Sequence, residues 1–408
     1  MKPGYKQTEI GKIPEEWEMV RLGEVVNYSK GRKPNIILEK HEKSFEPYLT
    51  AESMRTGVFN LWCEIDEDVI KVKSNDIIFI WDGSFSGDVF TGFCGVLAST
   101  MVKIDPRQNN LDKKYLFYFL KTKFKLFNST TTGTSIPHIS KSIFTSLKLP
   151  LPPLPEQQRI AEVLSTVDSA IKKTAEIITK TQALKKGLMQ QLLTRGIGHT
   201  KFKQTEIGKI PEEWEVVRLG SVAKKFISGG TPSTSKPEYW NGKIPWMRSA
   251  HIKGRFVDWG EKYISEEGFK NSATNLVPGK NILVATRVCI GRVAINKIDI
   301  AISQDLTGVV VDKDKVNFEY LYWTLLYFEN TMKSWTQGST IKGVLRNDLQ
   351  NLKLPLPPLP EQQKIAEILS AVDEKIEAGR KKKEKLEQLK KGLMQDLLTG
   401  RVRVKYEA

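Results

Sequence analysis

The sequence predicts a mixed α+β fold with two globular α/β bodies in a tandem, pseudo-twofold repeat, separated by a pair of long antiparallel coiled-coil helices. Three observations support this prediction: long blocks of sequence occur twice, the interiors of the two copies differ, and each copy ends in a long segment with helical spacing of apolar residues. With 408 residues, 40% of them hydrophobic, the chain is long enough to form two hydrophobic cores.

The repeated blocks indicate that the chain consists of two tandem copies of one unit. Three blocks recur without a change: KQTEIGKIPEEWE at 6–18 and 203–215, LKLPLPPLPEQQ at 147–158 and 352–363, and KKGLMQ at 185–190 and 390–395. The first block recurs after 197 residues and the other two after 205, so the second copy has gained eight residues inside its body. Self-similarity at this scale predicts the same fold twice.

The interiors of the two copies are as informative as the repeated blocks. Residues 26–110 and 223–315 share almost no run of letters. A duplication without a functional reason would drift more evenly along its length. Constant flanks around variable interiors instead indicate a protein that performs one operation on two different targets.

A long helical segment follows each LPLPPLP run. Apolar or small residues recur at about a 3.5-residue spacing over 160–192 and again over 365–397, which is typical of coiled-coil helices. Gly196 and Gly400 suit the C-terminal caps of these helices. An ordinary helix pair inside one compact core is the alternative, but helices of this length with mostly polar surfaces rarely belong to such a core.

Chain order fixes how these segments should be arranged. We expect bodies at 1–150 and 199–354, and helices within 151–198 and 355–408. The first helix carries the chain from one body to the other and the second carries it back, so paired helices must be antiparallel. A helix of about 39 residues extends for roughly 58 Å, which would place the bodies at opposite ends of a rod.

Composition points to a polyanionic partner. Lys and Arg number 63 against 47 Asp and Glu, a net charge of +16, which favours nucleic acid, although a lysine-rich surface alone would give the same balance. Cys63, Cys94 and Cys289 are far apart, so we expect no disulfide framework and no metal site. No stretch reaches the roughly 18 apolar residues of a membrane span, and we expect a cytoplasmic protein.

Each body ends in a loop of glycine and hydroxyl residues followed by a cation. TGTSI at 132–136 precedes Lys141, and QGSTI at 337–341 precedes Arg346, with each cation eight positions after the glycine. Glycine permits a close approach of the backbone, and hydroxyl and amide groups can bond phosphate oxygens. The pattern therefore indicates a phosphate clamp used twice, with a plain helix-to-strand turn as the alternative. The aromatic runs at 115–120 and 320–325 indicate core packing rather than base stacking.

Side chains that read bases should differ between the bodies. Aspartate can accept a hydrogen bond from cytosine and arginine can donate to guanine, so the contrast of Asp82 and Asp88 with Arg287 and Arg292 fits two different targets. Each candidate taken alone is more often a surface or structural residue. The candidate DNA contacts are Arg32, Lys33, Arg55, Asp82, Ser84, Asp88, Gly133, Thr134, Ser135, His138 and Lys141 in the first body, and Thr231, Trp246, Arg248, Arg255, Arg287, Arg292, Gln304, Gln337, Gly338, Ser339, Thr340, Lys342 and Arg346 in the second.

Catalytic motifs are missing from the sequence. No G-x-x-x-x-G-K-[ST] run encodes an NTP-driven motor, and no Asn-Pro-Pro or Asp-Pro-Pro run resembles an amino-methyltransferase. No convincing glycine fingerprint for a dinucleotide is present either. We therefore expect no cofactor and no catalysis by the chain itself.

The PLPEQQ run that opens both long helices, with a Gly-Thr/Ser loop shortly before it, resembles the specificity subunits of type I restriction-modification systems over essentially the whole chain. GGTPS at 229–233 is a further hallmark of that family, whereas the first body has GRKPN at 31–35. The resemblance implies two target recognition domains, each reading half of a bipartite site in double-stranded DNA. It also implies two methyltransferase subunits docked around the helices, and restriction subunits in the full complex.

Two other classes of protein stay open at this point. A self-sufficient endonuclease or methyltransferase would modify DNA as a purified chain. A coiled-coil scaffold with two protein-binding heads would bind no DNA even with its partners present. If the rod separates two DNA-reading heads, its length corresponds to at most about 17 base-pair steps of about 3.4 Å.

Overall fold

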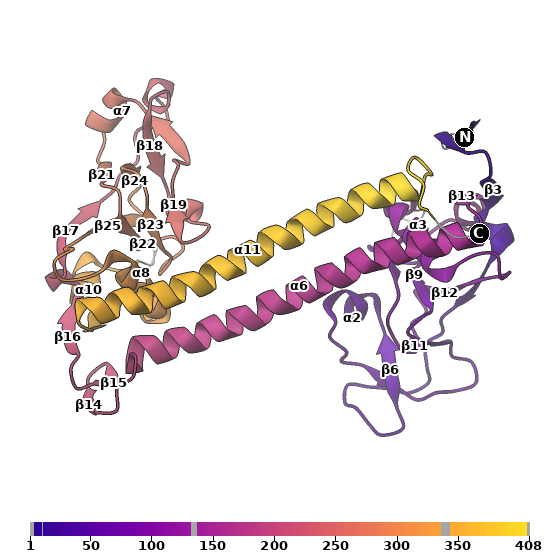
Figure 1. Cartoon of the computed structure of the whole chain (residues 1–408), viewed down its shortest axis with the longest axis horizontal. Coiled ribbons are helices and arrows are strands. Elements are labelled where there is room, and N and C mark those ends of the chain that lie inside the picture. The colour runs from indigo at the N-terminus through magenta and orange to yellow at the C-terminus, as the bar shows by residue number, and fades with distance from the viewer. Residues whose placement is uncertain (1–3, 10, 132–136, 336–342, 406–408) are drawn as a thin grey trace. The chain divides into compact units, whose positions relative to one another are not determined.

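The computed structural model describes residues 4–9, 11–131, 137–335 and 343–405 (Figure 1). The chain folds into two compact units. Unit 1 comprises Met1–Ala175 and Lys381–Ala408, and unit 2 comprises Glu176–Arg380. Each unit contains one α/β body, the first part of one long helix and the last part of the other. The long helices are α6 (Leu154–Arg195) and α11 (Leu359–Leu397), which lie within the predicted segments 151–198 and 355–408.

The body of unit 1 is built from two sheets, with strand orders β10-β9-β12-β4 and β5-β7-β6-β11-β8. The central strand β9 is buried along its whole length, which explains its unbroken apolar run IIFI. The strands are β4 (Val26–Lys30), β5 (Ile37–Leu38), β6 (Glu46–Leu49), β7 (Trp62–Cys63), β8 (Lys71–Val72), β9 (Ile77–Ile80), β10 (Val89–Phe90), β11 (Gly95–Leu97) and β12 (Met101–Pro106). The helices are α1 (Leu22–Val25), α2 (Ala51–Thr56), α3 (Lys113–Thr122), α4 (Phe124–Ser129) and α5 (Lys141–Ser146).

The body of unit 2 repeats this plan with sheets β17-β25-β22-β23-β19 and β20-β18-β24-β21. Strand β6 pairs in parallel with β11, and β18 pairs in parallel with β24, so the second sheets correspond. The strands are β17 (Ala223–Ser228), β18 (Ile244–Met247), β19 (Phe256–Val257), β20 (Lys262–Ile264), β21 (Asn275–Val277), β22 (Asn281–Ala285), β23 (Val293–Asn296), β24 (Ile300–Ile302) and β25 (Leu306–Val311). The helices are η1 (Leu219–Ser221), η2 (Pro237–Trp240), η3 (Ser249–His251), α7 (Glu266–Lys270), α8 (Phe318–Tyr327), α9 (Glu329–Ser334) and α10 (Arg346–Asn351).

The identical blocks pair with one another inside each unit. A hairpin precedes the body of each unit, and the strand that follows it pairs with the strand made by the KLPL residues of the second block. The register is the same in both units: Arg21 faces Lys148, and Arg218 faces Lys353. The strands are β1 (Tyr5–Thr8), β2 (Gly11–Pro14), β3 (Glu18–Arg21) and β13 (Lys148–Leu151), and β14 (Phe202–Thr205), β15 (Gly208–Pro211), β16 (Glu215–Arg218) and β26 (Lys353–Leu356).

The aromatic runs of α3 and α8 are core residues, as the sequence predicts. Residues 115–120 and 320–325 are all buried. The Tyr115 hydroxyl donates to the carbonyl oxygen of Pro150 at 2.7 Å, and the Tyr320 hydroxyl donates to that of Pro355 at 2.8 Å. These bonds attach each aromatic helix to the strand that leads into a long helix.

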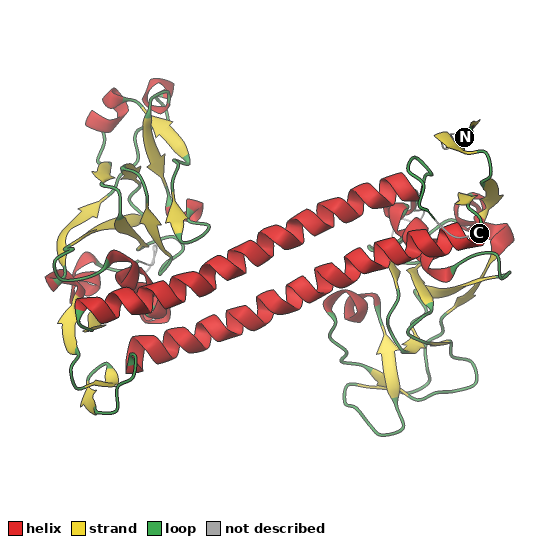
Figure 2. Ribbon diagram, in the orientation of Figure 1, coloured by secondary structure: helices red, strands yellow, loops and turns green. Residues whose placement is uncertain are grey.

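The two long helices are unbroken along their length (Figure 2) and pack against each other with opposite chain directions inside each unit. In unit 1 the Lys390 ammonium lies 2.5 Å from a carboxylate oxygen of Asp168, and in unit 2 Lys185 lies 2.5 Å from Asp373. The predicted antiparallel pairing is therefore confirmed. None of the described helices combines the length and the apolarity needed to cross a bilayer.

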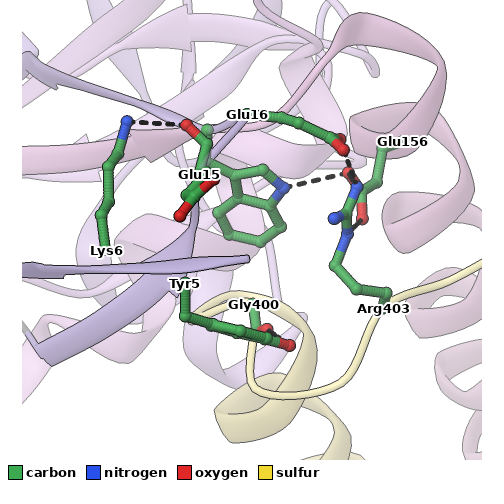
Figure 3. A network of polar contacts seen from close by, with 8 residues as sticks. Tyr5, Lys6, Glu15, Glu16, Glu156, Gly400 and Arg403 are labelled. Atoms are coloured by element: carbon green, nitrogen blue, oxygen red, sulfur yellow. Dashed lines mark hydrogen bonds and ion pairs between the residues drawn. The ribbon is translucent and has the colours of Figure 1, made fainter. Parts of the chain in front are cut away.

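A polar network, which we name the clasp, holds the start of one long helix to the end of the other. In unit 1 the Trp17 indole donates to the Glu156 carboxylate at 3.0 Å, and the Arg403 guanidinium donates to the same carboxylate at 2.5 and 2.8 Å (Figure 3). The Tyr5 hydroxyl donates to the carbonyl oxygen of Gly400 at 3.2 Å. Glu156 raises the pKa of Arg403 through these hydrogen bonds. A buried carboxylate thus joins the N-terminal hairpin, α6 and the residues after α11.

Unit 2 has an equivalent clasp made by the second copies of the same blocks. The Trp214 indole donates to the Glu361 carboxylate at 2.9 Å. His199, which follows α6, takes the place of the arginine, with its Nε2 at 2.9 Å from the same carboxylate. The clasp explains why the Trp of the first block and the Glu of the second are kept in both copies.

Candidate nucleic-acid interface

The two bodies place different side chains at one position of their common framework. Strand β9 pairs with β12 as β22 pairs with β25. Two facing pairs show the shared register, Ile80 with Met101 and Ala285 with Leu306. Asp82 and Arg287 therefore stand at equivalent positions just beyond the ends of β9 and β22. The predicted contrast between an acid and an arginine falls at a single place in the fold.

A loop that needs glycine lies next to this position in both bodies. A Cβ atom added to Gly31 would lie 2.3 Å from a main-chain oxygen that follows β11, and one added to Gly229 would lie 2.2 Å from a main-chain oxygen of β24. A side chain at either position would displace the neighbouring backbone. The first body therefore keeps the glycine of the GGTPS loop, although its letters differ. Lys33 stands two residues after Gly31, as Thr231 stands two after Gly229.

In unit 1 the Asp82 carboxylate lies between the side chains of Lys30 and His138. Lys30 lies 2.9 Å from one carboxylate oxygen, and His138 Nδ1 lies 3.2 Å from the other. The side chain of Asp82 is 14% exposed, whereas Lys30 and His138 are each 53% exposed. The site thus presents hydrogen-bond donors around a recessed acceptor. No sequence pattern indicated Lys30, because its partner Asp82 lies 52 positions away.

A second cluster in unit 1 joins α2 to the loop before β10. The Arg55 guanidinium lies 3.5 Å from the centre of the Phe85 ring and 3.7 Å from the Asp88 carboxylate. Burial raises the pKa of Asp88, and the nearby positive charge of Arg55 opposes this shift. Phe85 is 39% exposed, so the cluster presents an arginine stacked on an aromatic ring at the surface. Sequence reasoning missed Phe85.

The other described candidates of unit 1 are exposed. Arg32 lies 2.9 Å from the Asp68 carboxylate, and both side chains are largely open to solvent. The main-chain carbonyl of Ser84 accepts a hydrogen bond from the Asn128 side-chain amide at 3.3 Å, and this bond does not involve the serine hydroxyl. Lys33 and Lys141 are also exposed, and Lys141 is the first residue of α5. These exposed cations are not part of the Asp82 and Arg55 clusters.

In unit 2 the exposed polar side chains are fixed by hydrogen bonds to one another. The Thr231 hydroxyl donates to the Gln304 side-chain oxygen at 2.5 Å. The Arg248 guanidinium makes a two-pronged contact with Glu261, which lowers the pKa of that carboxyl through a side-chain hydrogen bond. The Arg287 side chain is exposed. Gln304, Arg248 and Arg287 are the groups of this body best suited to contact base edges.

A buried aspartate supports this surface from below. The Asp305 carboxylate accepts hydrogen bonds from the main-chain NH of Ser249 at 3.0 Å and from the hydroxyls of Ser249 and Ser303. Asp305 directly follows Gln304, and Ser249 directly follows Arg248. The hydrogen bonds between Asp305 and Ser249 therefore link the segments that carry Gln304 and Arg248. Sequence reasoning missed this support, because an isolated aspartate carries no pattern.

Two predicted DNA contacts are core residues instead. Trp246 is 2% exposed, and its indole donates to the carbonyl oxygen of Gly230 at 3.0 Å. The Arg255 side chain is 5% exposed, with its guanidinium 2.8 Å from Glu319 and 5.3 Å from the centre of the Trp323 ring. Neither side chain can reach a DNA duplex without unpacking the body. Arg292 is exposed and donates to the carbonyl oxygen of Ile252 at 3.4 Å.

The two glycine-hydroxyl loops lie largely outside the described residues, as do eight candidates. The chain that leaves each loop is described, and it lies beside the framework position of Asp82 and Arg287. Gly83 NH donates to the carbonyl oxygen of Pro137 at 2.8 Å, and Val344 NH donates to that of Thr286 at 2.7 Å. Arg346 begins α10, and its guanidinium donates to the carbonyl oxygen of Phe226. The candidates outside the described residues are Gly133, Thr134, Ser135, Gln337, Gly338, Ser339, Thr340 and Lys342.

The described residues of both bodies thus bring together donors and acceptors suited to base edges and cations suited to phosphates. Within the described ranges, no group of three or more His, Cys, Asp or Glu side chains is placed to hold a metal ion. The chemistry that the surfaces support is hydrogen bonding and charge pairing with a polyanion.

Comparison with known proteins supports the same conclusion. The model of the type I restriction modification DNA specificity domain matches residues 14–181 and again 211–388. The chain is 36% identical to the type I restriction enzyme MjaVIII specificity subunit of Methanocaldococcus jannaschii, covering 98% of this chain and 96% of that one. It is 26% identical to the EcoR124I/EcoR124II specificity subunit of Escherichia coli, covering 90% and 89%.

The fold is similar to that of a solved specificity subunit. The crystal structure of the S subunit from M. genitalium superposes with a TM-score of 0.63 at 18% identity, and the match covers 97% of this chain and 99% of that one. At that identity the likeness concerns the fold alone. Taken with the domain matched twice and the relatives aligned over almost their full length, it shows that the chain belongs to the type I restriction-modification specificity subunits, the DNA-recognising and non-catalytic members of those complexes.

Proposed function

We propose that each unit reads one half of a bipartite target in double-stranded DNA, with the surface around Asp82 in unit 1 and the surface around Arg287 and Gln304 in unit 2. One observation carries this proposal: two copies of one framework present an acid and an arginine at the same position. Identical supports with different side chains are what recognition of two different half-sites requires.

The chemistry of each surface suggests how it reads bases. In unit 1 the recessed Asp82 can accept from a cytosine amino group, while Lys30 and His138 can donate to purine acceptors. In unit 2 Thr231 engages the side-chain oxygen of Gln304, which leaves the amide NH groups to donate to a base. Arg287 can donate twice to guanine, and one such contact discriminates by about 1–3 kcal/mol.

Other candidates fit contacts to phosphates, which anchor a protein without reading sequence. The described ones are exposed cations, together with the exposed hydroxyl residue Ser84. The loops at 132–136 and 336–342 lie between the described strands and helices of each site, so we retain them as phosphate clamps. The anchoring set comprises Arg32, Lys33, Arg55, Ser84, Gly133, Thr134, Ser135 and Lys141 in unit 1, and Arg292, Gln337, Gly338, Ser339, Thr340, Lys342 and Arg346 in unit 2, whereas Asp88 and Arg248 stay candidates for base edges.

We also propose that the chain acts in the cytoplasm as the recognition part of a larger complex. The relatives are named as subunits of type I restriction enzymes, which supports assembly with methyltransferase and restriction subunits. The number of methyltransferase subunits would be two, one for each copy of the repeat. The long helices α6 and α11 would then set the spacing between the half-sites.

A methylation map tests the proposal. The chain is co-expressed with the neighbouring methyltransferase gene, and methylated adenines are mapped across the genome. We expect one bipartite motif. Replacing residues 26–110 by the corresponding segment of another specificity subunit should change one half of the motif and leave the other half and the spacing as they were. A change in both halves would show that the bodies do not read independently.

A further inference from the structure

The turn between β11 and β12 in unit 1 corresponds residue by residue to the turn between β24 and β25 in unit 2. Strands β11 and β24 enter the turns in the same parallel register, and β12 and β25 leave them in the same antiparallel register. Each turn is closed by a main-chain hydrogen bond of 3.1 Å, from Met101 NH to the carbonyl oxygen of Ala98 and from Leu306 NH to that of Ser303. The two residues at the tip of the turn are Ser99 and Thr100 in unit 1, and Gln304 and Asp305 in unit 2. Ser99 therefore stands where Gln304 stands.

Each turn lies against the position of Asp82 or Arg287. In unit 1 the Thr100 carbonyl oxygen accepts hydrogen bonds from the main-chain NH groups of Trp81 and Asp82 at 2.9 and 3.0 Å. In unit 2 the Asp305 carbonyl oxygen accepts from the NH of Thr286, the residue before Arg287, at 2.9 Å. The tip of the turn is thus fixed beside the acid in one body and beside the arginine in the other.

A second hydrogen bond ties each turn to the rest of its body, and it differs between the units. In unit 2 the buried Asp305 carboxylate accepts from the main-chain NH of Ser249 at 3.0 Å. In unit 1 the partner is Tyr48 on β6: burial raises the pKa of its hydroxyl, and a main-chain hydrogen bond at Ser99 opposes this rise. Both tips therefore have an ordered backbone, which lowers the entropy that a side chain at the tip loses when it binds a ligand.

The first residue of the tip is exposed in both units and differs between them. The residues that precede it, Ala98 and Ser303, are 5% and 1% exposed, whereas Ser99 and Gln304 are open to solvent. Serine and glutamine are uncharged, and each can donate as well as accept a hydrogen bond. A phosphate group is best matched by a cation, whereas base edges present both donors and acceptors. The chemistry at the tip therefore suits a base edge.

The residue beside the acid or the arginine changes size together with it. The chain segments that follow the two glycine-hydroxyl loops bond the same framework carbonyls in both bodies, so His138 and Gly343 are equivalent. His138 lies beside the short side chain of Asp82. A Cβ atom built on Gly343 would lie 3.3 Å from Cγ of Arg287, so the longer arginine has a neighbour without a side chain. The side chains around the turn thus differ between the units as a set, as expected of two surfaces that contact different bases.

We infer that Ser99 is a further specificity-determining residue of unit 1, whose hydroxyl contacts a base edge at the place where Gln304 does so in unit 2. This inference rests on the proposed function and adds a residue to the surface around Asp82. The base would belong to the same half-site as the base that Asp82 contacts, because the Thr100 carbonyl joins the two segments. A serine hydroxyl pairs with donors and acceptors alike, so this position should discriminate less in unit 1 than in unit 2.

Exchange of the tip residues tests this inference. The full chain is co-purified with the methyltransferase subunit and titrated with duplexes that carry each single-base change of the mapped motif. Ser99→Gln should raise discrimination about fivefold or more at one base pair of the unit 1 half-site and leave the other half-site as it was. Ser99→Ala should lower discrimination at the same base pair about twofold to tenfold. Gln304→Ser should relax the preference at one base pair of the unit 2 half-site.

Ser74→Gln is the matched control. Ser74 is an exposed serine in the turn before β9, at the opposite end of that strand from Asp82. This variant should leave the preference at every base pair unchanged. Melting temperatures separate reading from folding: both glutamine variants should melt within a degree or two of the unsubstituted chain, because both serines are exposed.

Three results would overturn the inference. Ser99→Gln could leave every base preference unchanged, it could weaken binding to all duplexes equally, which indicates a phosphate contact, or Ser74→Gln could produce the same change in preference. Two further variants distinguish this failure from that of the proposed function. If Asp82→Asn and Arg287→Ala alter base preferences while Ser99→Gln does not, the inference about the turn fails alone. If none of the three variants alters a preference, the proposed reading surfaces fail with it.

Discussion

Removing the carboxylate of the unit 1 clasp should destabilise that unit severely. The Glu156 side chain is fully buried and accepts from both Trp17 and Arg403. Glu156→Ala leaves a buried indole NH without its partner and removes the main counter-charge of a guanidinium that is 18% exposed. Breaking a buried ion pair costs about 3–5 kcal/mol, and the lower end applies because Arg403 keeps Glu16 at 3.0 Å.

The expected loss can be followed as a shift of thermal unfolding. For a unit of about 200 residues, a loss of about 3 kcal/mol corresponds to a fall in melting temperature of roughly 6–12 °C. Circular dichroism of the full chain would measure it. The control is Glu162→Ala, which breaks an exposed pair with Arg159 and should cost less than about 1 kcal/mol. If both variants melted within a degree or two of each other, the clasp would not stabilise the fold as we argue.

Four further outcomes follow from the structure. Asp82→Asn should relax the base preference in one half of the target, and Arg287→Ala in the other half, each by about 1–3 kcal/mol of discrimination in a binding assay with single-base variants; a loss spread over both halves would contradict separate reading. Lys141→Ala should weaken binding about equally for all sequences and lower the slope of log affinity against log salt by about 1; an unchanged slope would rule out a phosphate contact. Asp76, although burial raises its pKa, accepts hydrogen bonds from the main chain at Lys73 and from lysine side chains that bring the net pKa below the usual value. Because this folded pKa is depressed, its contribution to stability is present above about pH 4 and is lost as pH falls through the folded pKa, and Asp76→Asn should flatten the acid limb of a pH titration of stability. Inserting seven residues into both α6 and α11 should lengthen the gap between methylated half-sites or abolish methylation; an unchanged gap would exclude a spacing role for the helices.

Much of the architecture was predictable because the repeated blocks pair with one another. The repeated blocks contain the residues that both copies need. In the structure these residues form the β3–β13 and β16–β26 pairs and the two clasps. The long helices were equally predictable from the sequence, since their apolar spacing continues over many turns. Local patterns and internal repetition therefore suffice for elements whose partners are also repeated.

The reading surfaces were only partly predictable, because their contacts join segments that are distant in sequence. Trp246 was predicted to contact DNA, yet its indole reaches a carbonyl 16 residues away and the side chain is buried. Arg255 looked like a DNA contact, yet its charge pairs with Glu319 on α8. Lys30 and Asp305 were overlooked for the same reason. Burial and pairing depend on tertiary packing, which the spacing of residue types along one segment does not encode.

The two clasps differ in one respect that bears on how the polypeptide can be divided. In unit 2 the helix end and the hairpin that meet at Glu361 are consecutive in the chain. In unit 1 the corresponding partners, Arg403 and the segment around Trp17, are almost 400 positions apart and meet through non-covalent contacts. Unit 1 therefore demonstrates that this junction closes without a peptide bond. A nick placed between Gly198 and Lys201 should accordingly leave two fragments that remain associated, and separately expressed fragments should complement each other when mixed.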